Sequence, residues 1–125
     1  MSIDKLSIEI DGFFTQYTAK AMDVVDDAIK KTSANCVRNV REKAPKRTGA
    51  YAKSWSRKMS NAGHHTEATV YAKAPHYRLT HLLENGHATA DGGRVEGKAH
   101  IKPAAEEASQ ELERRITQGM EAIVK

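Results

Sequence analysis

The sequence predicts an α+β fold: a long N-terminal helix and a C-terminal helix packed with a small antiparallel β-sheet, whose core is one β-hairpin, and a short helix. Two changes of pattern indicate this. Apolar residues recur every three or four positions before Pro45 and again after Pro103, which is the helical period, whereas the residues from Ser54 onward alternate as in a strand. A length of 125 residues suits one core, so we expect residues 1–125 to form a single domain.

The first element is a helix expected over about residues 3–43. Pro45 ends it, because the residue before a proline avoids the helical region. Such a helix would be about 60 Å long, too long for this chain to cover, so Gly12 is expected to kink it or to separate its first turns. Alternation between Leu6 and Ile10 leaves a strand open as the alternative there. The apolar stripe comprises Ile3, Leu6, Ile10, Phe13, Tyr17, Ala21, Val24 and Ala28, then Ile29, Cys36, Val37 and Val40.

A β-hairpin is expected over about residues 54–73. It is preceded by a turn and one helical turn, where Thr48 can accept backbone N–H bonds and Gly49 begins the helical residues. Two alternating runs then flank a short glycine-containing turn, which is typical of a hairpin. Trp55 is the only tryptophan in the chain, and we expect it to anchor the buried face.

A short helix is expected over about residues 77–85, closed by Gly86 at its C-terminal cap. The loop over residues 86–100 contains four glycines and no strong period. It is expected to be mobile in the free subunit, with at most a short strand near Val95. The apolar side of the short helix consists of Leu79, Leu82 and Leu83.

A C-terminal helix is expected over about residues 103–124. Pro103 suits its first turn, and Glu106 and Glu107 suit its positive end. Its apolar stripe consists of Ala105, Ala108, Leu112, Ile116, Met120 and Ile123.

The net charge of +4 is distributed unevenly along the chain. Residues 35–102 carry a net charge of +8, whereas residues 1–34 and residues 103–125 each carry −2. This distribution is compatible with binding of nucleic acid, with pairing to the acidic ends of a neighbouring copy, or with an ordinary solvated surface.

Membrane and secretory roles are not indicated. No apolar run approaches the ~20 residues that span a bilayer, and no basic segment followed by an apolar one suggests a secretory signal. Cys36 is the only cysteine, so it forms no internal disulfide. It is expected to be a small apolar residue on a helix, in a protein made in a reducing cytoplasm.

His81, Glu84 and His87 raise the possibility of a metal site, because a carboxylate and two imidazoles suit zinc. However, their spacing matches no zinc signature such as H-E-x-x-H. A nuclease would use histidine and basic residues for acid–base chemistry, yet nothing here pairs a nucleophile with a base. We therefore expect no enzymatic activity, no cofactor and no required metal. Glu84 and His81 are instead expected to bond to the basic middle segment.

Two sequence blocks resemble those of a phage protein family. "APKRTGAYAKSW" at 44–55 and "HYRLTHLLENGHATADGGRVEGKAHIKPAAEEA" at 76–108 are similar, in order and spacing, to the signatures of the small tail-component, or neck, family of Hong Kong 97-type siphophages and related prophages. Tyr51 stands where many members have Leu, a change that still permits burial. The matching residues are Pro45, Thr48, Gly49 and Ser54 in the first block, and Tyr77, Leu82, Glu84, Gly86, His100, Pro103 and Ala104 in the second.

The resemblance implies a structural role. Such proteins act as rings of identical subunits at the head–tail junction or in tail completion, and they bind other connector and tail proteins. DNA would pass through the ring lumen without specific binding. The resemblance places the chain in the virion, and in the host cytoplasm during assembly. It implies that Tyr77 and the leucines pack the short helix on the sheet, and that Glu84 and Gly86 fix its end. In a ring, we expect the loop to order against a neighbour, where Arg94 and Lys98 can meet acids on an adjacent helix. The alternative is a small basic nucleic-acid-binding protein or hydrolase.

Overall fold

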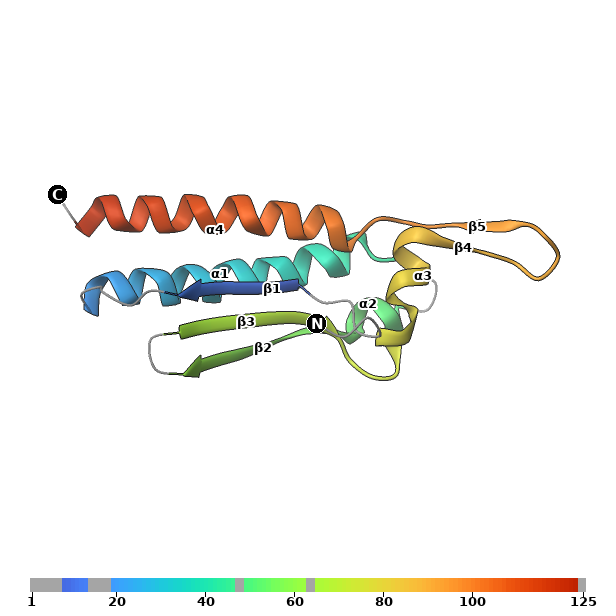
Figure 1. Cartoon of the computed structure of the whole chain (residues 1–125), viewed down its shortest axis with the longest axis horizontal. Helices are drawn as coiled ribbons and strands as arrows, with labels where there is room; N and C mark the ends of the chain where they lie inside the picture. The colour runs from blue at the N-terminus through green and yellow to red at the C-terminus, as the bar shows by residue number, and fades with distance from the viewer. Residues whose placement is uncertain (1–7, 14–18, 47–48, 63–64, 124–125) are drawn as a thin grey trace.

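The computed structural model describes residues 8–13, 19–46, 49–62 and 65–123. A three-stranded antiparallel sheet with the strand order β1–β3–β2 lies against helix α1, and helix α4 runs along the other side of α1 (Figure 1). This confirms the predicted α+β fold. The elements are β1 (Ile8–Phe13), α1 (Ala19–Lys43), α2 (Ala50–Ser54), β2 (Trp55–Ala62), β3 (His65–Ala72), the 3-10 helix η1 (His76–Leu79), α3 (Thr80–Asn85), β4 (Gly86–Ala88), β5 (Arg94–Glu96) and α4 (Ile101–Ile123).

The N-terminal helix is shorter than predicted, because residues 8–13 form strand β1 and α1 begins at Ala19. The prediction of a helix was therefore wrong over residues 8–13. The strand alternative, made for Leu6–Ile10, is confirmed from Ile8 onward, and residues 6 and 7 lie outside the described residues. Gly12 lies in the strand opposite Thr66 rather than at a helix kink. The physical reason is that the open edge of β3 offers backbone partners to this segment, which local periodicity does not reveal. Ile3, Leu6 and Tyr17 of the predicted stripe lie outside the described residues.

Helix α1 has 25 residues, which corresponds to about 37 Å. It ends at Lys43, shortly before Pro45, as predicted. Because the sheet lies on one side of α1 and α4 on the other, the helix is covered on two sides. Its buried residues are Ala21, Val25, Ala28, Ile29, Thr32, Ser33, Cys36 and Val40.

The predicted hairpin is formed by β2 and β3, which pair in antiparallel register with Trp55 opposite Ala72. Ala68, Val70 and Ala72 on one face of β3 are buried against the helices, and Trp55 is fully buried at the start of β2. Trp55 is thus the anchor that the sequence predicted. The core cluster comprises Val25, Ile29, Cys36, Val40, Ala44, Tyr51, Ala52, Trp55, Ala68, Val70, Ala72, Ile101, Ala104 and Ala108.

Residues 86–98, which we call the arm, form a two-stranded ribbon rather than the unpaired loop that was predicted. In it, β4 pairs with β5, with His87 opposite Val95. The strand expected near Val95 is therefore present, but its pairing with the residues after Gly86 was missed. Figure 1 shows the arm projecting beyond α3, away from the rest of the molecule.

Helix α4 begins two residues earlier than predicted and packs closely along α1. Gly119 permits the close approach of α4 to α1, because a Cβ atom at this position would lie only 2.4 Å from Cγ1 of Val24. A polar link crosses the same interface, because buried Glu111 accepts hydrogen bonds from Asn35 at 2.8 Å and from Arg115 at 2.7 Å. From the predicted stripe, Ala108 is buried, and Ala105, Leu112 and Met120 pack against the core.

Candidate functional site

Glu84 binds the start of helix α4, although it belongs to helix α3. Its Oε1 accepts hydrogen bonds from the backbone N–H groups of His100 and Ile101 at 2.7 and 2.8 Å, and its Oε2 accepts one from Lys102 at 2.9 Å. The next residue, Pro103, has no N–H to satisfy. Glu84 therefore supplies hydrogen-bond acceptors and a negative charge where a helix has unpaired donors and a positive dipole end.

The imidazole of His100 is enclosed between Glu84 and helix α2. Its Nδ1 lies 2.7 Å from the carbonyl oxygen of Lys98 and 3.0 Å from Oε1 of Glu84. Both of these atoms are acceptors, so Nδ1 carries a proton. In the neutral ring, Nε2 then accepts a hydrogen bond from the hydroxyl of Tyr51, at 2.7 Å. A continuous chain of hydrogen bonds thus joins α2 to α3 and α4.

Tyr51, Trp55 and His100 also contact one another through their rings. Each pair is edge-to-face, with ring centroids 6.4 Å apart for Tyr51 and Trp55, 5.4 Å for Tyr51 and His100, and 6.2 Å for Trp55 and His100. Such pairs contribute about 0.5–1.5 kcal/mol beyond the area they bury. The three rings and the capping carboxylate of Glu84 form one unit, which we call the corner cluster.

The electrostatics of the corner cluster favour a charged Glu84 and a neutral Tyr51. Burial acts to raise the pKa of Glu84, but the three backbone N–H groups outweigh it, so that the pKa lies below the usual 4.5. Burial, aided by the charge of Glu84, raises the pKa of Tyr51 to about 12. His100 is fully buried, Tyr51 is 7% exposed and the Glu84 side chain is 8% exposed. The cluster therefore holds elements together and presents no reactive group to a substrate.

The arm begins at the corner cluster, where two glycines let its strands meet. Gly86 ends α3 with a φ of 79°, and a Cβ on it would lie 2.4 Å from the carbonyl oxygen of Val95. A Cβ on Gly97 would lie 2.4 Å from the backbone nitrogen of Gly86. The N–H of Lys98 also donates to the carbonyl of Leu83 at 2.9 Å. These contacts fix the direction in which the arm leaves the molecule, and Gly86 closes α3 as predicted.

The first sequence block forms the other side of the corner cluster. Pro45 follows the end of α1, and Gly49 precedes α2 with a φ of 81°, which favours glycine. Ser54 is buried and donates a hydrogen bond to the carbonyl of Tyr51 at 2.5 Å. Thr48 lies outside the described residues. Burial of Tyr51 is as expected, but its bond to His100 was not foreseen, because the two residues are 49 positions apart.

The short helix packs less extensively than predicted. Tyr77 and Leu83 contact the core, whereas Leu79 and Leu82 are 41% and 44% exposed. The expectation that all the leucines pack the helix on the sheet was therefore wrong for these two. Helix α3 has only six residues, and its main contacts are with η1 and β4 rather than with the three-stranded sheet.

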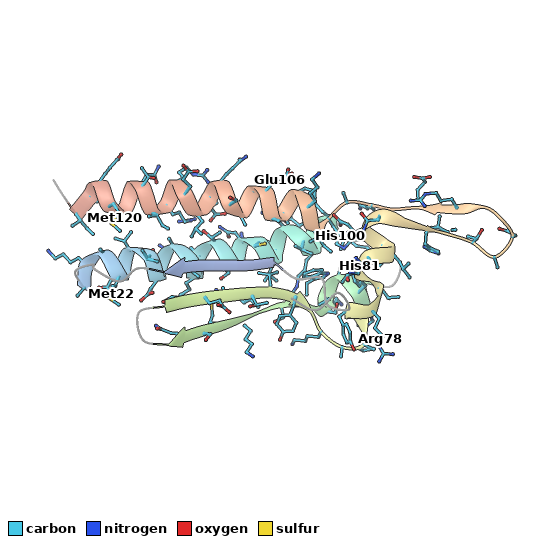
Figure 2. The ribbon with its side chains drawn as sticks, in the orientation of Figure 1. Met22, Arg78, His81, His100, Glu106 and Met120 are labelled. Carbon is cyan, nitrogen blue, oxygen red and sulfur yellow. The ribbon has the colours of Figure 1, made fainter. Side chains whose placement is uncertain are left out.

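The histidines and the cysteine form no metal site in the described part of the chain, where no group of three His, Cys, Asp or Glu side chains is placed to hold an ion. Glu84 bonds to His100, Ile101 and Lys102, the last three residues of the basic middle segment 35–102, as expected. His81 is exposed on α3 (Figure 2). Cys36 is buried against Ala104, and burial raises the pKa of its thiol to about 11. It is the inert helix residue that was predicted.

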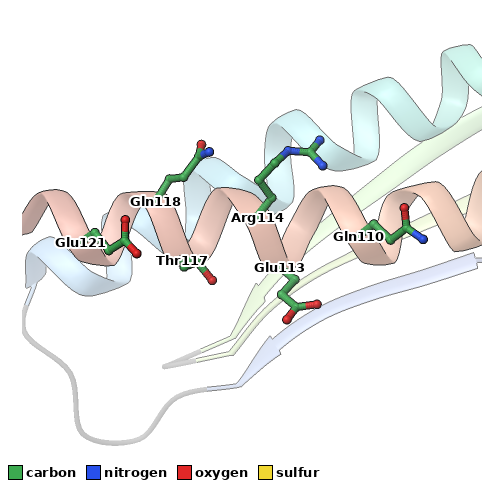
Figure 3. A pocket seen from close by; sticks show the side chains of 6 residues that line it. All are labelled: Gln110, Glu113, Arg114, Thr117, Gln118 and Glu121. Carbon is green, nitrogen blue, oxygen red and sulfur yellow. The ribbon is translucent and has the colours of Figure 1, made fainter.

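A shallow polar hollow lies along the exposed side of α4 (Figure 3). Its described lining residues all come from this one helix, so it lacks the enclosing walls of a ligand site. These residues are Gln110, Glu113, Arg114, Thr117, Gln118 and Glu121.

Comparison with protein families gives a match, over residues 8–86, to the family described as "Bacteriophage HK97-gp10, putative tail-component". This range covers well over half of the chain. The chain belongs to the HK97-gp10 family. No curated protein and no solved structure matches it. The match includes β1, the first sequence block and Glu84, and it stops at the base of the arm.

An HK97-gp10 protein is a tail component, so this chain is a structural protein of a phage virion and interacts with other virion proteins. The corner cluster is consistent with that role, since its groups brace the fold. None of the described helices is long and apolar enough to cross a bilayer.

Proposed function

We propose that this HK97-gp10 protein is a neck or tail-completion component of the head–tail junction and acts there as a ring of identical subunits. The family supports the virion role, and the observation that carries the ring is the arm. Every residue from Ala90 to Ala99 is exposed, although the arm is a defined ribbon with a fixed base. An isolated two-stranded ribbon is marginally stable, so a neighbouring subunit is the natural source of further contacts.

The geometry of the arm favours a head-to-tail contact. The arm projects from one end of the molecule, whereas the long helices extend toward the other (Figure 1). A contact between two different surfaces of the same chain repeats around an axis and closes into a ring when the rotation permits.

Arg94 and Lys98 remain the proposed interface residues of the arm. The guanidinium of Arg94 donates one hydrogen bond to the carbonyl of Asn85 at 2.6 Å, so it also braces the base of the arm. The other N–H groups of Arg94 and the exposed Lys98 can meet carboxylates on a neighbour's helix. Each such surface pair contributes about 0–1 kcal/mol, so the pairs tune the contact. Val95 is 45% exposed and adds apolar area.

The test is a phage in which the gene carries Val95→Asp, compared with one carrying Met59→Asp. Met59 on β2 is 41% exposed, so the control adds the same charge at a similarly exposed apolar site away from the arm. We expect Val95→Asp to give unjoined heads and tails by electron microscopy, and Met59→Asp to give normal particles. Light scattering of purified rings should show dissociation only for Val95→Asp.

Deletion of the whole gene tests the role of the protein in the virion independently of the role of the arm. We expect it to give unjoined or incomplete tails. Normal infectious particles without the protein would overturn the proposed function, and normal rings of the Val95→Asp variant would overturn the part played by the arm.

A further inference from the structure

We propose that one end of this molecule binds the phosphate backbone of duplex DNA. This basic end is formed by the last turn of α1, the segment after it, α2 and the link from β3 to η1. The proposal rests on the neck assignment for its biological setting, where a ring encloses DNA, but it concerns a property that the isolated subunit already has. The cations of the basic end are Arg41, Lys46, Lys53, Lys73 and Arg78, and all five are exposed.

Hydrogen bonds join the segments that carry these cations. The guanidinium of Arg41 donates to the carbonyl of Lys53 at 3.5 Å and, more closely, to that of Trp55 at 2.5 and 3.0 Å. The N–H of Lys73 donates to the carbonyl of Ser54 at 2.9 Å. The last turn of α1, helix α2 and the end of β3 therefore lie next to one another. Figure 2 shows Arg78 at this same end, remote from Met22 and Met120.

Few carboxylates accompany these cations along the chain. Among the described residues from 41 to 81, Glu42 is the one exposed acid, and Glu67 is half-buried at the other end of the hairpin. Lys43 has its own partner, Glu107, at 3.6 Å. In the first half of α1, by contrast, the three acids Asp23, Asp26 and Asp27 match three lysines. The described residues from 41 to 81 therefore carry an excess of positive charge, and five of their exposed cations belong to the basic end.

The composition of the basic end favours DNA over an acidic protein surface. Three of its five cations are lysines, which are depleted in protein–protein interfaces but are ordinary contacts to phosphate. No described aromatic side chain at this end is exposed, since Tyr71 and Tyr77 are half-buried, so there is no platform for unstacked single-stranded bases. A surface with cations and no stacking residues is suited to binding the phosphates of a duplex, and such binding has no sequence preference.

The experiment measures binding of the full-length protein to a fluorescent 30-base-pair duplex, by anisotropy, as NaCl is raised from 50 mM. We expect affinity in about the micromolar range at low salt and a linear fall of log K with log salt. The variant Lys53→Gln/Lys73→Gln/Arg78→Gln should bind about tenfold or more weakly at 50 mM, and its slope should be shallower by about 3.

A control variant, Lys20→Gln/Lys30→Gln/Arg114→Gln, removes the same charge from exposed positions on α1 and α4 outside the basic end. We expect its affinity to stay within about threefold of the unmodified chain. Circular dichroism melts verify folding. If the triple variant does not fold, Lys53→Gln/Lys73→Gln keeps the contact of Arg78 with the Tyr77 ring and should reduce the slope by about 2.

Equal losses in the two triple variants, or no binding by the unmodified chain at 50 mM NaCl, would overturn the proposal. Tighter binding of poly-glutamate than of duplex at equal charge would also overturn it, in favour of an acidic protein partner. None of these results bears on the ring, because its assembly is measured separately by electron microscopy and light scattering.

Discussion

At the scale of single residues, the corner cluster shows how one carboxylate replaces a local helix cap. Glu84 accepts hydrogen bonds from three backbone N–H groups at the start of α4, and these lie 16 to 18 positions after it in the sequence. Its charge also faces Nδ1 of His100, which in turn bonds through Nε2 to Tyr51. Removal of this one side chain would leave buried donors on both α4 and His100, and an unsatisfied buried donor costs more than an average hydrogen bond contributes.

We predict that Glu84→Gln lowers the free energy of unfolding by about 1–3 kcal/mol, because an amide has one acceptor oxygen and no charge. Chemical denaturation measures the loss. Glu106→Gln is the matched control, since Glu106 is exposed on α4, the helix that Glu84 caps, and should change stability by about 0.5 kcal/mol or less. If the two substitutions lowered the free energy of unfolding equally, the capping hydrogen bonds of Glu84 would stabilise the fold no more than an exposed carboxylate does.

The same carboxylate predicts a dependence of stability on acid pH. The pKa of Glu84 is lower in the folded chain than its usual 4.5, so its contribution is fully present above that value. The contribution is lost as the pH falls through the lowered pKa. We expect the unmodified chain to lose more stability than Glu84→Gln between neutral and acid pH. Parallel pH profiles of the two proteins would refute this assignment.

Trp55 is the second residue on which stability depends. We predict that Trp55→Ala costs about 3–5 kcal/mol, the range for loss of a large buried aromatic side chain, because the residue is 0% exposed and contacts both Tyr51 and His100. Denaturation followed by circular dichroism measures it, since the substitution removes the tryptophan fluorescence. Trp55→Phe should cost less. A loss below about 1 kcal/mol for Trp55→Ala would be inconsistent with this packing.

At the scale of elements, the arm depends on close backbone contact at its base. Gly97 lies against Gly86 and the last residues of α3, with no room for a side chain. Backbone atoms form most of this contact, and they cannot rotate away as the end of a long side chain can. The base of the arm is thus rigid even though its tip has few contacts of its own.

We predict that Gly97→Ala separates the base of the arm and destabilises the fold by about 1–3 kcal/mol, the usual cost of overpacking. Hydrogen exchange should show faster exchange of the Lys98 N–H, which donates to Leu83. Ala88→Ser is the control, because Ala88 is exposed on β4. Unchanged exchange in Gly97→Ala would mean that the backbone shifts without loss of the arm.

At the scale of the whole molecule, the helices and sheet form one body and the arm extends from it (Figure 1). Val95 is its only sizeable apolar residue, so the arm buries little surface that would offset the entropy of ordering it. The expectation that the arm is the most mobile internal segment of the free subunit therefore stays a prediction. A neighbouring subunit in a ring would restrict it.

We predict that trypsin cleaves at Arg94 early in the free subunit and slowly in assembled virions or rings. Arg94 is exposed, and a protease needs several residues around the bond to adopt an extended form. Mass spectrometry of timed digests identifies the site. Cleavage at the same rate in both states would refute the assembly role of the arm, while leaving the family membership intact.

Local pattern was sufficient for the type of most elements. Alternation on both sides of a short turn predicted β2 and β3, and a helical stripe after Pro103 predicted α4, because side-chain periodicity follows directly from backbone geometry. Trp55 was identified as the buried anchor because no other side chain of its size was available. The two sequence blocks were sufficient to indicate the phage family.

Such local patterns could not predict the contacts between segments that are distant in the sequence. Residues 8–13 became a strand because β3 had an open edge, not because their own spacing excluded a helix. The bond between Tyr51 and His100, the cap of α4 by Glu84 and the pairing within the arm join residues whose proximity depends on how the helices pack. Periodicity tells which face of an element is apolar, but the partner that covers this face is chosen by the energy of the whole fold.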